Sequence, residues 1–241
     1  MKDKIAIVTG GGQGIGRGVC LGLADAGARV VVNDVLPERA EAVAAEIDGL
    51  AAAGDIGTRA GAEALVGSAI DAFGRVDILV NNAGISKDRY LAKMSDEEWD
   101  EVLRVNLTAQ FLTCRAVVPR MMEQRYGRIV NISSRAWLGG PGQANYSASK
   151  GGVVSLTRTL ALELAKFGIT ANCVAPALVD TPLFQGLPEE ARERLGKSVP
   201  MGRVGTPADI ANAVRFFAAA ESSYVTGQVL YVCGGRSLGL F

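Results

Sequence analysis

The chain has 241 residues, enough for one large α/β domain, and 49% of them are hydrophobic and 21% charged, as is usual for a globular protein. Lysine plus arginine and aspartate plus glutamate number 25 each, so we expect neither nucleic acid nor an anionic membrane as a partner. The sequence contains no histidine, which excludes a Ser-His-Asp hydrolase and a Cys-His protease and argues against a catalytic zinc ion. Acid–base chemistry must therefore come from Tyr, Lys, Asp, Glu or Cys.

We expect no targeting or membrane-spanning segment. The charged N-terminus leads into an apolar run that is too short for a signal peptide, and no stretch approaches the ~18 apolar residues of a membrane span. The cysteines have no C-x-x-C spacing, so we expect reduced, buried thiols of a cytoplasmic protein. They are Cys20, Cys114, Cys173 and Cys233.

The N-terminal segment predicts a phosphate-binding turn. Residues 4–9 are a short apolar run suited to a buried parallel strand, and a helical pattern follows the glycine-rich residues 10–16. Glycines at 10, 14 and 16 permit a tight turn and a close approach of the backbone to a phosphate. The free N–H groups at the start of the helix favour a pyrophosphate there.

A carboxylate follows the second predicted strand. The run 29–33 ends at Asp34, 18 residues beyond Gly16 and near the ~20 expected for a group that accepts from a ribose 2′-hydroxyl. A carboxylate there repels a 2′-phosphate, and Gln13 adds no positive charge to hold one. We therefore expect NAD(H) rather than NADP(H). The alternative role for Asp34 is to cap the next helix.

The rest of the chain alternates between helical and strand-like segments. We expect helices at 38–47, 59–73, 95–124 (one helix, or two that meet near Asn106), 146–166, 188–196 and 207–219. We expect further strands at 49–54, 76–80, 128–133, 169–174 and 228–232. This alternation predicts one α/β domain over residues 1–241, a doubly wound (Rossmann) seven-stranded parallel sheet with helices on both faces. The proline-containing segment 177–205 predicts a lid over the site.

The candidate chemistry lies between Ser133 and Lys150. Tyr146 and Lys150 are four residues apart, so they share one face of the predicted helix. A free tyrosine has a pKa of ~10, and a nearby ammonium group is expected to lower it. Ser133 and Ser134 end a predicted strand and supply hydroxyls to hold a carbonyl oxygen while the phenol gives or takes its proton. As an isolated pair, Tyr146 and Lys150 would be ordinary surface partners.

Amide side chains mark two further positions. Residues 81–84, Asn-Asn-Ala-Gly, follow a predicted strand and suit the ligand crevice of a doubly wound sheet, although they would also make a plain turn. Asn106 lies among apolar residues of the long predicted helix. We expect its amide to be satisfied locally or to hold a water near Lys150.

Together these motifs resemble the short-chain dehydrogenase/reductase family over nearly the whole chain. The family's Thr-Gly-x-x-x-Gly-x-Gly motif occurs at 9–16, its Asn-Asn-Ala-Gly motif at 81–84 and its Tyr-x-x-x-Lys motif at 146–150. The resemblance implies four catalytic residues: Asn106, Ser134, Tyr146 and Lys150. Ser134 is preferred because the second serine after the strand is the usual one, although Ser133 has the more usual spacing of 13 residues from the tyrosine.

The resemblance also implies where a dinucleotide binds, with adenine near Asp55 and Ile56 and the nicotinamide carboxamide near Thr181. The expected cofactor contacts are Gly10, Gln13, Gly14, Ile15, Gly16, Asp34, Asp55, Ile56, Asn82, Ala83, Gly84, Tyr146, Lys150, Pro176, Val179 and Thr181. Candidates for the substrate pocket are Trp137, Leu138, Gln143, Leu178 and Phe184. No metal is expected.

Within the family, segments 81–88, 96–99 and 142–146 are similar to those of 3-oxoacyl-acyl-carrier-protein reductases. This resemblance implies an oxidoreductase that interconverts a secondary alcohol and a ketone, most simply a 3-oxoacyl thioester of acyl carrier protein or CoA. Asp34 argues for NAD(H) as its cofactor. Arg125 matches a basic position that docks the carrier protein, whereas Phe167 falls where a second basic residue is expected.

Other functions stay open. The reductases of this subfamily mostly prefer NADPH, so a catabolic NAD-dependent dehydrogenase of a diol or cyclic alcohol is an alternative. A non-catalytic dinucleotide-binding sensor, and an epimerase or dehydratase with permanently bound NAD, are alternatives of other classes. Family resemblance implies a homotetramer, and the apolar helix faces at 107–124 and 153–165 are candidate subunit contacts.

Overall fold

A seven-stranded sheet forms the centre of the computed structural model, which describes residues 1–238. All neighbouring strands are parallel, in the order β3-β2-β1-β4-β5-β6-β7. The strands are β1 Ile5–Val8, β2 Arg29–Val32, β3 Leu50–Ala51, β4 Ile78–Asn81, β5 Gly127–Ile132, β6 Ile169–Pro176 and β7 Val229–Val232. β1, β4, β5 and β6 are buried along their whole length, as expected for strands that are covered on both faces. The predicted doubly wound parallel sheet is therefore confirmed.

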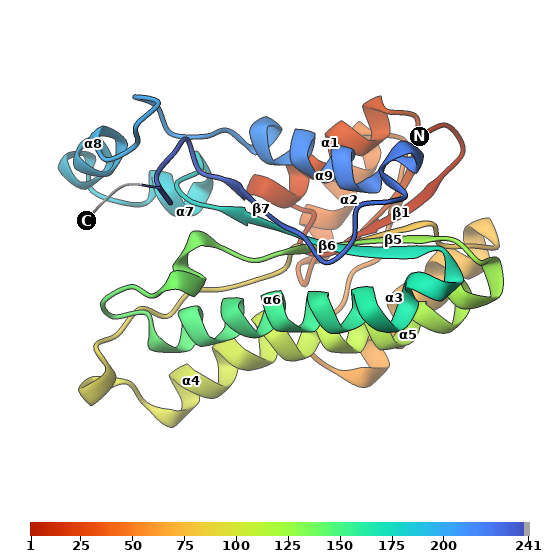
Figure 1. Ribbon diagram of the computed structural model, residues 1–241, viewed down its shortest axis with the longest axis horizontal. Helices are drawn as coiled ribbons and strands as arrows, with labels where there is room; N and C mark the ends of the chain where they lie inside the picture. The colour runs from red at the N-terminus through yellow and green to blue at the C-terminus, as the bar shows by residue number, and fades with distance from the viewer. Residues whose placement is uncertain (239–241) are drawn as a thin grey trace.

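Helices cover both faces of this sheet (Figure 1). One layer contains α1 Gly14–Asp25, α2 Pro37–Glu46 and α9 Pro207–Ala218, and the other contains α3 Arg59–Phe73, α4 Asp96–Leu103, α5 Ala109–Gln124 and α6 Ala144–Leu164. Each layer has its own buried apolar cluster. Leu23 and Phe217 belong to the first, and Met121 and Leu164 to the second. The sheet thus separates two cores.

The strand order places the candidate site. The chain moves outward from β1 through β2 to β3 and then returns to β4 on the other side of β1. The carboxyl ends of β1 and β4 therefore leave a crevice at the point where the order reverses, which is where doubly wound sheets bind ligands. The glycine-rich turn follows β1, and residues 81–84 follow β4.

The long helix predicted at 95–124 is interrupted. It consists of α4 and α5 joined by a π-helix at Arg104–Thr108, and the predicted capping box at Ser95 and Glu98 begins α4. A π-helical turn inserts extra backbone and often marks a functional site, and this one contains Asn106. The weak strand predicted at 49–54 is only two residues long, and α6 begins at Ala144, two residues earlier than expected.

The segment 177–205 contains two short helices, α7 Pro182–Gln185 and α8 Glu189–Lys197, of which only the second was predicted. In Figure 1, α8 lies at one end of the molecule, beyond the layered body. Of the four cysteines, Cys233 is only partly buried, contrary to expectation, whereas the other three are buried. No helix within residues 1–238 is long and apolar enough to cross a membrane.

Candidate active site

The glycine-rich turn fits a closely approaching ligand. A Cβ on Gly16 would lie 1.9 Å from the carbonyl oxygen of Gly10, and Gly10 itself has a φ of 60°. Both positions therefore require glycine. Gln13 and Ile15 flank Gly14, at the start of α1, and the first N–H groups of that helix face the end of the turn.

Asn82 fixes this turn to the end of β4. Its side-chain nitrogen donates to the carbonyl oxygens of Thr9 and Gly10, both at 3.0 Å. The hydroxyl of Thr9 accepts from the backbone nitrogens of Asn82 and Ala83, at 3.0 and 3.1 Å. The two motifs 9–16 and 81–84 are therefore one hydrogen-bonded unit.

Asp34 is buried against the glycine-rich turn. Its carboxylate accepts from the backbone nitrogens of Gly12 and Leu36, at 3.1 and 3.2 Å. The second contact supports the turn into α2, but the helix cap itself is Leu36 without a side-chain bond. The carboxylate therefore places a negative charge beside the turn, which suits ribose hydroxyls and disfavours an additional phosphate.

Asp55 and Ile56 lie at the end of the crevice beyond β3. Asp55 forms an ion pair with Arg104 of the π-helix at 2.8 Å and accepts from the backbone nitrogen of Gly57. The Ile56 side chain is buried in the second core cluster. Any contact that Ile56 makes with an adenine would therefore involve its backbone or a small edge of its side chain.

Tyr146 and Lys150 lie together on the first turns of α6. Lys150 is 3% exposed. Its ammonium group donates to the carbonyl oxygen of Ile132 at 2.9 Å and lies 5.6 Å from the centre of the Tyr146 ring. It does not point into bulk solvent, so the interpretation of the pair as ordinary surface partners is wrong. Burial lowers the pKa of Lys150 to about 8, which still leaves it mostly charged at neutral pH.

The side chains of the protein raise the pKa of Tyr146, whereas the predicted lowering depends also on a closed pocket and on the positive charge of an oxidised nicotinamide and stays a prediction. Burial raises the pKa of the phenol, the hydrogen bond with Ser134 opposes this change, and the negative charge of Asp88 raises the pKa further. Desolvation is the largest of these contributions, and it raises the pKa because it disfavours the charged phenolate rather than the neutral phenol. The side chains of this protein therefore keep Tyr146 protonated at neutral pH.

The two serines have different partners. Ser133 is buried, and its hydroxyl donates to the carbonyl oxygen of Lys150 at 2.8 Å. Ser134 caps the short 3-10 helix Arg135–Leu138 and forms the hydrogen bond with Tyr146. This geometry favours Ser134 as the hydroxyl next to a reacting carbonyl, and it gives Ser133 a structural role in holding α6.

Asn106 is buried where the crevice meets α6. Its oxygen accepts from the backbone nitrogen of Ile85 at 2.8 Å, and its nitrogen donates to the Ile85 carbonyl oxygen and the Ser149 hydroxyl. A Cβ on Gly84 would lie 3.2 Å from the Asn106 oxygen and 3.3 Å from the Lys150 nitrogen. These groups therefore meet at one point, and the amide of Asn106 is satisfied locally.

The segment after β6 approaches the glycine-rich turn. Pro176 is the last residue of that strand, Val179 is buried in the first core cluster, and Thr181 caps α7. A Cβ on Gly14 would lie 3.4 Å from the Thr181 methyl group, so the start of the predicted lid touches the turn. Leu178 and Phe184 are half-buried in the same segment.

The other candidates for the substrate pocket have mixed environments. Trp137 stacks on Tyr231 of β7, with 6.5 Å between ring centres, and packs against the small apolar cluster around Val153. Leu138 is half-exposed. Gln143 donates to the Asp88 carboxylate at 2.9 Å, immediately before the helix that carries Tyr146.

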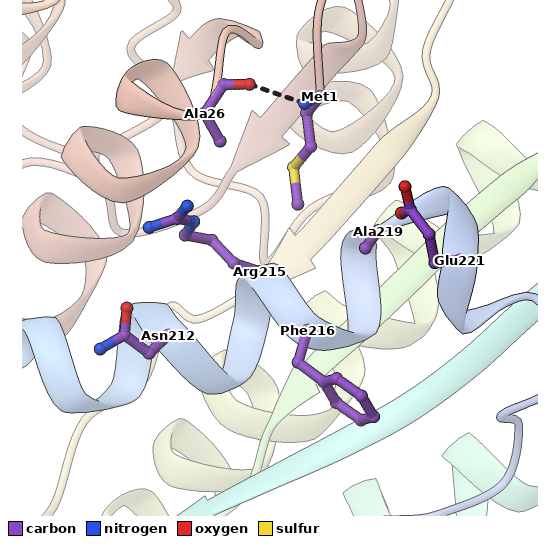
Figure 2. A pocket seen from close by; sticks show the side chains of 7 residues that line it. All are labelled: Met1, Ala26, Asn212, Arg215, Phe216, Ala219 and Glu221. Carbon is purple, nitrogen blue, oxygen red and sulfur yellow. Dashed lines mark hydrogen bonds between the residues drawn. The ribbon is translucent and has the colours of Figure 1, made fainter.

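Figure 2 shows a cavity that does not belong to this arrangement. It has a volume of about 420 Å³ and is lined by Met1, Ala26, Asn212, Arg215, Phe216, Ala219 and Glu221. These residues come from the N-terminus, the end of α1 and the outer side of α9. None of the predicted site residues lines it.

Sequence reasoning assigned no role to Asn145 and Asp88. Asn145 is fully buried, accepts from the backbone nitrogen of Tyr146 at 2.7 Å and donates to two carbonyl oxygens on neighbouring segments. An amide directly before the candidate tyrosine was the available signal for Asn145. Asp88 had no such signal, because its contact with Gln143 spans 55 residues of sequence.

Comparison with known proteins agrees with this geometry. A family model described as enoyl-(acyl carrier protein) reductase matches residues 10–237. Subunit BbsD of (2S)-[(R)-hydroxy(phenyl)methyl]succinyl-CoA dehydrogenase from Thauera aromatica is 49% identical, over 99% of this chain and 98% of that protein. The chain belongs to the short-chain dehydrogenase/reductase family. As a short-chain dehydrogenase/reductase, it is an enzyme that acts on CH–OH groups with a nicotinamide dinucleotide.

Two further relatives support the assignment. The 3-oxoacyl-[acyl-carrier-protein] reductase of Thermotoga maritima is 42% identical to this short-chain dehydrogenase/reductase, over 98% of each chain. The crystal structure of levodione reductase superimposes with a TM-score of 0.95 at 34% identity and covers 100% of both chains. The predicted resemblance to the family and to its 3-oxoacyl reductases is confirmed.

Proposed function

We propose that this short-chain dehydrogenase/reductase reduces the ketone of a 3-oxoacyl thioester, with NADH as the cofactor. The observation that carries the proposal is the partly buried Tyr146 phenol, which lies beside the Ser134 hydroxyl and one helical turn from the buried ammonium of Lys150. A protonated phenol at neutral pH is a proton donor, which is the role that reduction of a ketone requires.

The catalytic roles follow from the contacts of each side chain. Ser134 donates a hydrogen bond to the carbonyl oxygen and holds it within reach of Tyr146, which delivers the proton. Lys150 keeps a positive charge beside the phenol and is available to ribose hydroxyls. Asn106 holds the backbone at Ile85 and the hydroxyl of Ser149, and so fixes the floor of the site around Gly84.

The glycine-rich turn, Asp34 and Lys150 would hold the dinucleotide, because the turn has no room for side chains and the Asp34 carboxylate faces it. When bound, the nicotinamide supplies the hydride, and its oxidised form adds a positive charge that favours the phenolate in the reverse reaction. Asp34 next to the turn is the reason to propose NAD(H), because a 2′-phosphate would meet the negative charge of this carboxylate.

The thioester carrier is either CoA or acyl carrier protein. Relatives of both kinds support an acyl thioester, since one is named as a dehydrogenase of a succinyl-CoA derivative and the other as a 3-oxoacyl-[acyl-carrier-protein] reductase. The Arg125 guanidinium donates to the Lys166 carbonyl oxygen and lies 6.0 Å from the centre of the Phe167 ring. Arg125 and Lys166 thus give two adjacent positive charges for docking a carrier protein, where the family resemblance implies basic residues at positions 125 and 167.

We further propose that residues 1–241 act as one dinucleotide-binding and catalytic domain, with 177–205 as a lid over the substrate. The assembly proposed from the family is a cytoplasmic homotetramer. Phe111 on α5 and Leu162 on α6 support it, because these large apolar side chains are 44% and 84% exposed on the helices that were predicted to form subunit contacts.

A substrate panel tests the proposal. The purified enzyme is mixed with NADH or NADPH and with 3-oxoacyl thioesters of CoA or acyl carrier protein, cyclic diketones or diols, and nicotinamide absorbance is followed. We expect the largest kcat/KM with a 3-oxoacyl thioester and NADH. Faster turnover of a cyclic ketone or diol would support the catabolic alternative, and dinucleotide binding without turnover of any substrate would indicate a sensor or an enzyme with permanently bound NAD.

A further inference from the structure

The segment that follows residues 81–84 is attached to the start of α6. The backbone nitrogen of Arg89 donates to the carbonyl oxygen of Gly142 at 2.7 Å, and Arg89 and Gln143 form an isolated parallel bridge. The Asn145 side chain donates to the carbonyl oxygen of Lys87 at 3.1 Å. Residues 87–89 are therefore held against the residues that lead into Tyr146.

Asn145 makes this attachment rigid. It is fully buried, its oxygen accepts from the backbone nitrogen of Tyr146 at 2.7 Å, and its nitrogen also donates to the carbonyl oxygen of Glu98 at 3.1 Å. One amide thus joins the segment at Lys87, the end of the first turn of α4 and the backbone of Tyr146. The position of Asp88 relative to the phenol follows from these bonds.

Asp88 uses both carboxylate oxygens at the entrance to the site. One oxygen accepts from the Gln143 side-chain nitrogen at 2.9 Å, and the other accepts from the Ser86 hydroxyl. We propose that Asp88 is a positioning residue, which fixes the Gln143 amide at the entrance and keeps a negative charge beside the Tyr146 phenol. This inference rests on the proposed function, in which Tyr146 is the proton donor.

Among the groups around Tyr146, Asp88 is the carboxylate whose charge raises the pKa of the phenol. Lys150 faces the phenol from α6, with Cys173 of β6 next to the lysine, and Ser134 faces it from the end of β5. Asp88 raises the pKa of Tyr146 in the same direction as burial, while Ser134 lowers it.

The carboxylates of the neighbouring helix α4 have other partners. Glu98 pairs with Arg89 at 2.8 Å, and Glu101 pairs with Lys87. Their charges are therefore compensated locally, whereas the exposed Asp88 carboxylate is held by the neutral donors Gln143 and Ser86. Asp88 would help to keep Tyr146 protonated and so move the pH dependence of catalysis toward higher pH.

Three substitutions at position 88 separate charge from hydrogen bonding. Asp88→Asn keeps an oxygen that accepts from Gln143 but removes the charge, Asp88→Ala removes both, and Asp88→Glu keeps the charge. The pH dependence of ketone reduction and of alcohol oxidation is measured for each variant with the best substrate of the wild type. For Asp88→Asn we expect both midpoints to move toward acid, with KM nearly unchanged.

Asp88→Ala should show the same movement toward acid together with a KM several-fold higher, because Gln143 loses its partner. Asp88→Glu should retain the wild-type midpoints. The matched control is Asp100→Asn, which removes an exposed carboxylate from α4 and should leave the midpoints in place.

Midpoints that stay in place in Asp88→Asn, or that move equally in Asp100→Asn, would overturn the electrostatic role. An unchanged KM in Asp88→Ala would overturn the role in holding Gln143. A wild-type enzyme that turns over no carbonyl substrate would overturn the proposed function instead, so the two failures are distinguishable.

Discussion

Replacing Lys150 with methionine should stabilise the protein at neutral pH while it abolishes activity. Lys150 is 3% exposed, and burial lowers its pKa from 10.5 to about 8. At ~1.36 kcal/mol per pH unit, that difference corresponds to about 3 kcal/mol of unfavourable free energy for the charged form in the folded state. Methionine has a similar unbranched length and no charge.

Part of this gain is offset by a lost hydrogen bond. Lys150 donates to the Ile132 carbonyl oxygen at 2.9 Å, and losing such a bond costs about 1–2 kcal/mol. We therefore expect Lys150→Met to be more stable than the wild type by roughly 1–2 kcal/mol near pH 7. The enzyme would thus retain a destabilising charge because the reaction needs it.

The pH dependence of this difference has a definite sign. Below pH 8 the lysine is charged in both the folded and the unfolded states, so the cost is complete. Between pH 8 and 10.5 the unfolded state binds more protons than the folded state, so wild-type stability rises with pH relative to Lys150→Met. The advantage of the variant should therefore shrink across this window.

Urea unfolding at one fixed protomer concentration, near pH 7 and again near pH 9.5, measures both effects. Tryptophan fluorescence is a suitable signal, since Trp137 packs against the cluster around Val153. A variant that is less stable than the wild type near pH 7, or a difference that stays constant up to pH 9.5, would refute the reasoning.

Two further substitutions test the division of roles in the site. Ser134→Ala should lower kcat by roughly 10²-fold or more because the carbonyl oxygen loses a donor. Ser133→Ala should keep kcat within a few-fold and lose about 1 kcal/mol of stability. Similar kcat values for the two variants would contradict this assignment. Asp34→Ala should relax the discrimination against NADPH, measured as the ratio of kcat/KM with the two cofactors, and a wild type that already prefers NADPH would contradict the role of Asp34.

Local patterns in the sequence were sufficient for the sheet and for the two motifs at its edge. The strands are short runs of Val, Ile and Leu, and the glycine-rich turn and the 81–84 motif each lie directly after one of them. Because parallel strands end at one edge of the sheet, their order alone brings these motifs together. For the same reason, the sequence predicted that Ser134 and Tyr146, which follow another of these strands, lie at this edge.

Features that depend on distant contacts could not be predicted in this way. The π-helix contains Asn106, and the Asn106 side chain forms hydrogen bonds with the backbone of Ile85 on a separate segment. The position of Asp88 depends on Asn145 and Gln143, more than 50 residues away in sequence.

The effect of the surrounding side chains on the pKa of Tyr146 could not be predicted from the sequence for a related reason. The sequence places an ammonium one helical turn away, but the degree of burial of the phenol depends on every element packed around it. Desolvation is the largest contribution and raises the pKa. Burial of this kind is a property of the folded structure rather than of the spacing between two residues.

The proton-transfer role of Tyr146 is tested most directly by Tyr146→Phe, which removes only the hydroxyl. Steady-state turnover of the carbonyl substrate and the dissociation constant of NADH are measured on the same preparation. We expect turnover to fall by about 10³-fold or more while NADH affinity stays within a few-fold of the wild type. Turnover close to that of the wild type would contradict the assignment of Tyr146 as the proton donor.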